Sequence, residues 1–135
     1  FVEVVRCLTK KAANNPGMNI VGISAVGAFI GNSTKTAYCA SKSAMNSAVR
    51  CLAKELAPKG IRLNTVAPGA TDTPMAREAA DYRDGTEEQR VNALRQYMGT
   101  CQPADIADSV AFLLSDMSRM ITGVCLPVDG GKLSS

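Results

Sequence analysis

The sequence predicts an α/β protein with a parallel sheet, and three observations support this fold class. The apolar runs 18–24 and 61–67 are rich in β-branched residues, which is typical of buried strands. The segment between them is long enough for a crossover helix. The predicted order of helix, strand, helix, strand, helices and strand is the order that crossover-linked parallel strands produce. The 135 residues suffice for one domain with a hydrophobic core.

The elements of the first half follow from local signals. Residues 1–13 have helical spacing, with a stripe of Val2, Val5, Leu8 and Thr9, and the run 14–17 (Asn-Asn-Pro-Gly) breaks this helix. After the strand comes a loop rich in glycine and small polar residues. A long helix over about 36–57 is then predicted, because apolar residues recur at helical spacing until a proline and a glycine end it.

The second half begins with the strand 61–67, which Pro68-Gly69 closes. The polar stretch that follows has broken helical periodicity, which is typical of a mobile segment over a site, and we expect residues 74–100 to be the least ordered. Gln102-Pro103 opens a further helix, and the strand 124–128 with its Gly-rich turn ends the pattern. The predicted core face of that helix consists of Ile106, Ala107, Val110, Ala111, Leu113 and Leu114.

The composition argues against several classes of function. Net charge is +3 without a basic tract, so we expect no nucleic-acid partner. There is no histidine, and the five cysteines contain no Cys-x-x-Cys, so we expect reduced thiols in a cytoplasmic protein and no metal site. No apolar run is long enough to span a membrane. The chain starts within an amphipathic pattern and without methionine, which we interpret as a truncation.

Tyr38 and Lys42 form the first candidate site. They are four residues apart, so they share one face of the long helix, close to its start. In a parallel α/β sheet, ligands bind beyond the carboxyl ends of the strands, where Ser24 and the Pro68-Gly69 turn should also lie. A nearby ammonium and the helix dipole favour the phenolate, so we expect the tyrosine pKa to fall toward neutrality. A tyrosine tuned in this way can exchange a proton with a carbonyl or an alcohol.

Three motifs in this order give the chain a resemblance to a known family. They are "AYCASK" at 37–42, "IRLNTVAPGATDT" at 61–73 and "ITGVCLPVDGG" at 121–131. The sequence resembles the C-terminal half of the short-chain dehydrogenase/reductase family, in its single-domain branch, over essentially all its residues. Within that branch it looks most like the 3-oxoacyl-acyl-carrier-protein reductases. The fold implied is the C-terminal half of a doubly wound Rossmann-type sheet.

The resemblance implies hydride transfer between NAD or NADP and a small carbonyl or secondary alcohol. Tyr38 would be the acid–base, and Lys42 would lower its pKa and hold the ribose hydroxyls. Residues 74–100 would form a substrate lid, and a homo-oligomer is expected. The residues that would border the nicotinamide are Pro68, Gly69, Thr71 and Thr73.

The chain departs from the family pattern at the catalytic serine. That serine usually precedes the tyrosine by thirteen residues, a position held here by Ala25, while Ser24 lies beside it. Neighbouring strand residues point to opposite faces, so Ser24 supplies the hydroxyl only if the strand end is bulged or twisted. Without this donor the rate would fall by about 10²–10³.

A second departure is the absence of the family's N-terminal nucleotide-binding half, with its Gly-rich loop. We therefore expect residues 1–135 to be one part of a domain, inactive alone and unable to bind the cofactor alone. Two classes of function stay open from the sequence. One is an oxidoreductase of which this chain is a part, and the other is a non-catalytic relative used for binding or assembly.

Overall fold

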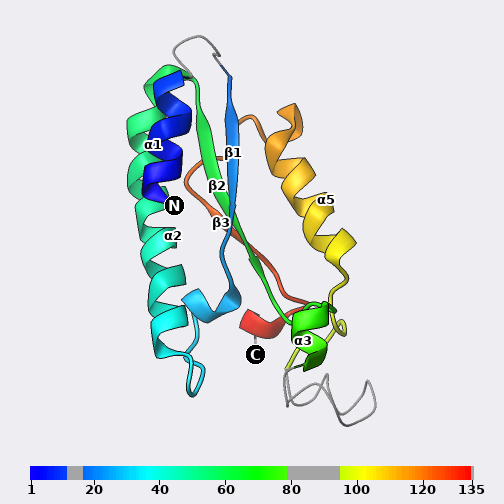
Figure 1. Ribbon diagram of the computed structural model, residues 1–135. Coiled ribbons are helices and arrows are strands. Elements are labelled where there is room, and N and C mark those ends of the chain that lie inside the picture. Colours follow the sequence, from blue (N-terminus) through cyan, green and yellow to red (C-terminus); the bar gives the residue numbers. More distant parts are fainter. Residues whose placement is uncertain (12–16, 79–94, 135) are drawn as a thin grey trace.

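The computed structural model is a three-stranded parallel sheet with helices on both faces (Figure 1), and it describes residues 1–11, 17–78 and 95–134. The strands β1 (Asn19–Ile23), β2 (Arg62–Pro68) and β3 (Cys125–Val128) pair in the order β1-β2-β3. Both pairings are parallel. The predicted α/β class and parallel strands are therefore confirmed.

The helices lie where the sequence predicted them. Helix α1 (Val2–Lys11) and the long helix α2 (Thr36–Leu56) cover one face of the sheet, and α5 (Pro103–Leu114) covers the other (Figure 1). A short helix α3 (Pro74–Glu78) follows β2. The remaining elements are single 3₁₀ turns, namely η2 (Val26–Ala28), η3 (Ala57–Lys59), η5 (Asp116–Ser118) and η6 (Lys132–Ser134).

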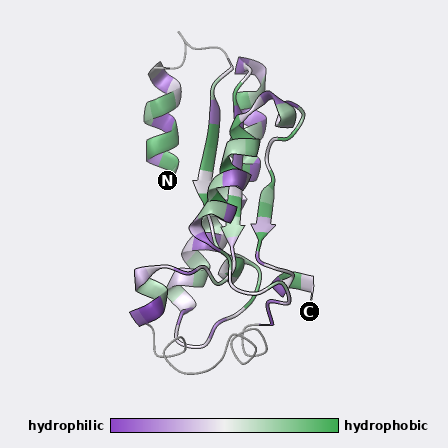
Figure 2. Cartoon of the chain, turned by 90° about the vertical axis from the view of Figure 1, so that its right-hand side faces the viewer, coloured by the Kyte–Doolittle hydropathy of each residue, from purple (hydrophilic) through white to green (hydrophobic). Residues whose placement is uncertain are grey.

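The core lies between α2 and the sheet. Strands β1 and β3 are mainly hydrophobic (Figure 2), whereas β2 also carries Arg62, Asn64 and Thr65. One cluster of buried side chains joins α1, α2, the turn before β2 and β2 itself, and burying each large member contributes about 1.5–3 kcal/mol. Its buried members are Val5, Val49, Ala53, Leu56, Ile61 and Leu63.

The predicted apolar stripe of α1 is only partly correct. Val5 is buried and Thr9 is half-buried, but Val2 and Leu8 are 52% and 43% exposed. Val5 and Thr9 are one turn apart, so they lie on one line along the helix that faces the rest of the protein. Val2 and Leu8 flank that line, so they face outward.

The core face predicted for α5 is also only partly correct. Leu113 is buried and Ile106 and Val110 are half-buried, whereas Ala107, Ala111 and Leu114 are exposed. The reason is that α5 packs on β1 and β2 across one side only. Within the part of the chain that the structure describes, no other helix lies beside it on that face (Figure 1).

Two polar side chains at the start of β2 anchor the elements around it. The guanidinium of Arg62 donates to the carbonyl oxygens of Leu113 at 2.9 Å, Ser115 at 2.9 Å and Ile121 at 3.1 Å, which satisfies the C-terminal end of α5. The buried amide of Asn64 donates to Ile121 O at 2.9 Å and accepts from the Val124 N–H at 3.1 Å. Asn64 is therefore a structural residue of this strand.

Candidate functional site

The residues predicted for the site line one cleft at the carboxyl ends of β1 and β2. The cleft has a volume of about 470 Å³. Its walls come from the ends of two adjacent strands, the first turns of α2, the segment leading into α3, and the start of α5. The lining residues are Ile23, Ser24, Ala25, Tyr38, Lys42, Pro68, Gly69, Thr71, Thr73, Met75, Pro103 and Ile106.

Two side chains of α2 fasten its first turns to the last residue of β1 and to the segment after it. The Lys42 ammonium donates to the carbonyl oxygen of Ile23 at 2.8 Å, and the Ser43 hydroxyl donates to Ala28 O at 2.9 Å. The Tyr38 ring packs against Gly27, where an added Cβ would lie 3.6 Å from it. These contacts bring Tyr38 and Lys42 to the edge of the sheet, together with the Pro68-Gly69 turn.

The electrostatics of Tyr38 differ from the sequence-based expectation. Partial burial raises the pKa of Tyr38 above its ordinary value, and the neighbouring Cys39 raises it further. The expected lowering is therefore not found, because partial burial is the largest influence on this pKa. The Lys42 ammonium donates to Ile23 O at 2.8 Å and lies 5.8 Å from the centroid of the Tyr38 ring. Tyr38 is therefore a phenol at neutral pH, the form that donates a proton.

Ser24 lies in the cleft although it is not at the usual serine position. Strand β1 ends at Ile23 and the chain enters η2 after Ala25, whose extended backbone has φ −163° and ψ 156°. Ser24 is 3% exposed, and its hydroxyl oxygen has no hydrogen-bond partner among the described residues. Rotating this hydroxyl about χ1 toward a ligand would break no existing hydrogen bond.

The turn after β2 carries two threonines that each make a local hydrogen bond. The Thr71 hydroxyl donates to Gly69 O at 3.3 Å, and the Thr73 hydroxyl accepts from the Ala76 N–H at 3.2 Å at the start of α3. Both side chains still line the cleft. The acceptor lone pairs of Thr71 and the hydroxyl hydrogen of Thr73 stay available to a ligand.

Sequence reasoning missed two features of this region. The apolar walls formed by Met75, Pro103 and Ile106 come from elements outside the three motifs. Gln96 is completely buried behind the Pro68-Gly69 turn, with no motif to indicate it. The predicted lid, 74–100, is described only at its two ends, since residues 79–94 lie outside the described residues; the lid stays a prediction.

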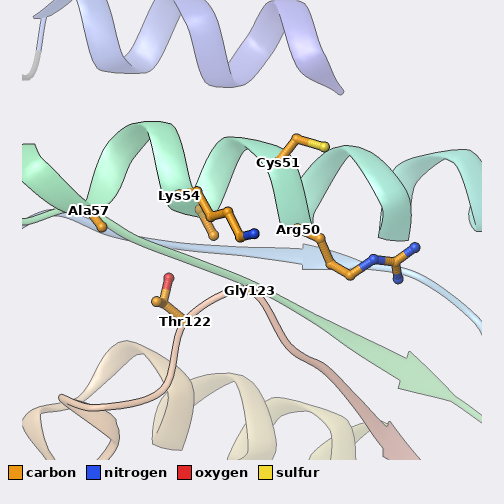
Figure 3. Close-up of a pocket in the computed structure, with 7 residues that line it drawn as sticks. Arg50, Cys51, Lys54, Ala57, Thr122 and Gly123 are labelled. Carbon is orange, nitrogen blue, oxygen red and sulfur yellow. The ribbon is translucent and has the colours of Figure 1, made fainter.

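A second hollow, of about 520 Å³, lies between α2 and the loop before β3 (Figure 3). Arg50 and Lys54 line it, but no carboxylate does. Lys54 is in the last turn of α2, where a cation complements the helix dipole. The guanidinium of Arg50 donates to the Ser47 hydroxyl at 2.9 Å and points away from Thr122 in Figure 3. These cations have structural explanations, so we assign no chemistry to this hollow.

The described ranges hold neither a metal-binding cluster nor a membrane-spanning helix. No group of three or more histidine, cysteine, aspartate or glutamate side chains there could hold a metal ion. None of the helices in those ranges is both long enough and apolar enough to cross a membrane.

Comparison with known proteins finds relatives that are named as reductases and oxidoreductases. The family model described as "Enoyl-(Acyl carrier protein) reductase" matches residues 1–132. The chain is 39% identical to the "Uncharacterized oxidoreductase YmfI" of Bacillus subtilis, covering 95% of this chain and 51% of that protein. It is 36% identical to a 3-oxoacyl-[acyl-carrier-protein] reductase of Rickettsia conorii, covering 92% of this chain and 50% of that protein.

Solved structures show the same architecture. A structure described as 4-hydroxyisoleucine dehydrogenase complexed with NADH and succinate superposes with a TM-score of 0.84 at 26% identity, covering 99% of this chain and 54% of that one. A putative short-chain alcohol dehydrogenase from Sinorhizobium meliloti gives 0.79 at 36% identity, covering 91% and 48%. This chain belongs to the short-chain dehydrogenase/reductase family. It spans about half the length of the relatives that it matches.

Proposed function

We propose that the chain is the C-terminal part of a cytoplasmic, homo-oligomeric oxidoreductase that uses NAD or NADP. The reaction is hydride transfer between the nicotinamide and a small carbonyl compound or secondary alcohol. The observation that carries the proposal is the cleft in which Tyr38, Lys42 and Ser24 lie together with the Pro68-Gly69 turn. Membership of a family of dehydrogenases and reductases supports the same reaction class.

The cleft fits the nicotinamide end of such a cofactor. Among the described residues that line it, Lys42 is the only charged one, so none of them is a carboxylate that would repel an anionic dinucleotide. Thr71, Thr73 and the backbone of the Pro68-Gly69 turn would hold the nicotinamide and its phosphate, and Lys42 would hold the ribose hydroxyls. When bound, the nicotinamide supplies or accepts the hydride.

The side chains of this chain would manage the proton. In carbonyl reduction, Tyr38 donates its phenolic hydrogen to the substrate oxygen, and its raised pKa keeps that hydrogen in place at neutral pH. The Lys42 ammonium then stabilises the phenolate that remains. Ser24 donates a second hydrogen bond to the same oxygen, which stabilises the charge developing on it. In alcohol oxidation the same groups act in the reverse order.

Replacing Tyr38 by phenylalanine in the full-length protein tests this proposal. Turnover should fall by about 10³ or more, since the proton donor is lost while the ring is kept. Cofactor affinity, measured by quenching of intrinsic fluorescence or by calorimetry, should change little. Equal turnover in the variant and the wild-type protein would refute the acid–base role.

The alternative is a non-catalytic relative used for binding or assembly. It predicts that the full-length protein binds NAD or NADP but oxidises no secondary alcohol and reduces no carbonyl in a broad screen. The first substrates to try are 3-oxoacyl thioesters, because a 3-oxoacyl-[acyl-carrier-protein] reductase is among the similar proteins. The same screen, run with both cofactors, decides between NAD and NADP.

A further inference from the structure

Gln96 is a fully buried amide that lies behind the cleft-lining turn. Its exposed fraction is 0%. Its Oε1 accepts from the Ala70 N–H at 2.8 Å, and its Nε2 donates to Ala70 O at 3.0 Å and to Gly99 O at 2.7 Å. The side chain therefore satisfies both backbone groups of Ala70, as a neighbouring peptide group does in a sheet.

Three segments of the chain meet at this amide. The turn after β2 is held to β3 by the Gly69 N–H, which donates to Val128 O at 2.9 Å. It is held to the segment before α5 by the Cys101 N–H, which donates to Ala70 O at 3.0 Å. The Asp72 N–H also donates to Cys101 O at 2.8 Å. Gln96 adds its contacts to Ala70, so the position of the turn depends in part on a residue near the end of the predicted lid.

The packing around Gln96 leaves little room for movement. A Cβ added at Gly69 would lie 2.5 Å from the Gln96 Oε1, and a Cβ added at Gly130 would lie 2.7 Å from its Cγ. Neither separation is possible for real atoms, so glycine at both positions permits the close approach. Arg95, directly before it, has φ +51°, a conformation that costs about 1–2 kcal/mol in a non-glycine residue.

We infer that Gln96 is a positioning residue for cofactor binding. Its side chain fixes the Pro68–Ala70 turn, and through it sets how tightly the nicotinamide end of the cofactor is held. The inference rests on the proposed function, because it takes the cleft face of Pro68 and Gly69 as the cofactor wall. A shift of about 1 Å in a binding wall can cost about 10²-fold in reactivity. A turn released from Gln96 should therefore bind the cofactor poorly.

The test compares two buried amides in the full-length protein. Gln96→Met keeps the side-chain length but removes every polar contact. Asn64→Leu, the matched control, removes an amide that also bridges backbone groups but lines neither the cleft nor its turn. We expect the KM for the nicotinamide cofactor to rise roughly tenfold or more in Gln96→Met and to stay within about twofold in Asn64→Leu.

Hydrogen exchange gives a readout that does not depend on catalysis. Peptides covering residues 67–73 should exchange roughly tenfold faster in Gln96→Met than in the wild type, and should not change in Asn64→Leu. If the wild-type protein shows no cofactor-dependent activity, the proposed function fails. The exchange measurement then still decides whether Gln96 holds the turn.

A third variant, Gln96→Glu, covers the case in which the methionine variant does not fold. The titratable groups beside this position are the Cys101 thiol and the Asp129 carboxylate. Burial and Asp129 should both raise the pKa of the introduced carboxyl, and its protonated form can accept from Ala70 N–H while donating one hydrogen bond back. The KM ratio of variant to wild type should therefore shrink as the pH falls from about 8 to about 6.

Three outcomes would overturn the inference. One is exchange over 67–73 that is unchanged in Gln96→Met. Another is a KM for the cofactor that rises equally in Gln96→Met and Asn64→Leu, which would indicate general destabilisation. The third is a KM ratio for Gln96→Glu that does not change with pH.

Discussion

The hydroxyl of Ser24 is a buried polar group at the cleft. It is buried beside Tyr38 and Lys42 and has no hydrogen-bond partner in the described part of the chain. Ser24→Ala in the full-length protein should lower kcat by about 10²–10³, because one donor to the reacting oxygen is lost. Steady-state kinetics with saturating cofactor would measure this change.

Ser109→Ala is the control for that prediction. Its hydroxyl donates to Asp105 O at 3.0 Å within α5 and does not line the cleft, so its loss should cost at most about 1 kcal/mol of stability and leave kcat nearly unchanged. If the two variants lose the same fraction of kcat, Ser24 has no special role in the reaction.

Cys101 should be the least reactive of the cysteines. It is buried, and burial together with Asp105 and Asp129 raises the pKa of its thiol above the ordinary value. Thiolate is the reactive form, so alkylation by iodoacetamide near pH 8 should be much slower at Cys101 than at the exposed Cys7 and Cys51. Mass spectrometry of the native full-length protein, with denatured protein as the control, would give the three rates. Comparable rates at Cys101 and Cys51 would contradict this account.

The sequence predicted the members of the cleft but not the charge state of Tyr38. The motif spacing and the rule for parallel sheets were enough to bring Tyr38, Lys42 and the Pro68-Gly69 turn together. The pKa of Tyr38 is raised mainly by partial burial, and the spacing of residues along a helix does not show how far a side chain is buried. Gln96 could not be predicted, because its three backbone partners come together only in the folded chain.

The bounds of the helices and strands are close to those that the sequence predicts. The predictions that were wrong concern which helix faces are buried. Helix α2 ends at Leu56 before the predicted breakers, and Gly60 takes the left-handed conformation at φ +68°. The burial of α1 and α5 was overestimated, because helical spacing shows an apolar face but not what packs on it. Val2 and Leu114 are apolar by pattern and exposed in the fold.

Of the polar residues of the sheet outside the cleft, Arg62 should be the one whose replacement lowers the free energy of unfolding most. Its guanidinium donates to three carbonyl oxygens, at the C-terminal end of α5 and in the following loop. Arg62→Met in the full-length protein should lower the free energy of unfolding by about 2–4 kcal/mol, because these acceptors lose a charged donor. Urea unfolding followed by circular dichroism would measure the loss.

Arg62→Lys is the matched variant. An ammonium is a point charge and cannot reach the three oxygens as a planar fork does, so it should recover less than half of the loss. Full recovery by lysine would show that charge alone matters at this position.

At the scale of the whole molecule, the free edge of β1 determines whether the isolated chain associates with other chains. β1 pairs with β2 only, and its other edge meets no strand in the described ranges. Unpaired backbone groups at a strand edge are a template for association. We therefore expect the isolated 135-residue chain to self-associate in solution and to bind neither NAD nor NADP.

Sedimentation and cofactor titration would test this expectation. Co-expression with the preceding half of the full-length protein should give a complex of defined size that binds the cofactor. A monomeric isolated chain with micromolar affinity for NAD or NADP would contradict it.

The unpartnered hydroxyl of Ser24 also links the stability of this protein to its proposed activity. A buried polar group without a partner costs the folded state about 1–3 kcal/mol, which a methyl group in its place does not. Stability alone would thus favour alanine at position 24, whereas the role proposed for Ser24 in turnover requires the serine. The Ser24→Ala variant should melt at a higher temperature than the wild type when no ligand is present. Its melting temperature should rise less than that of the wild type when a substrate analogue is added.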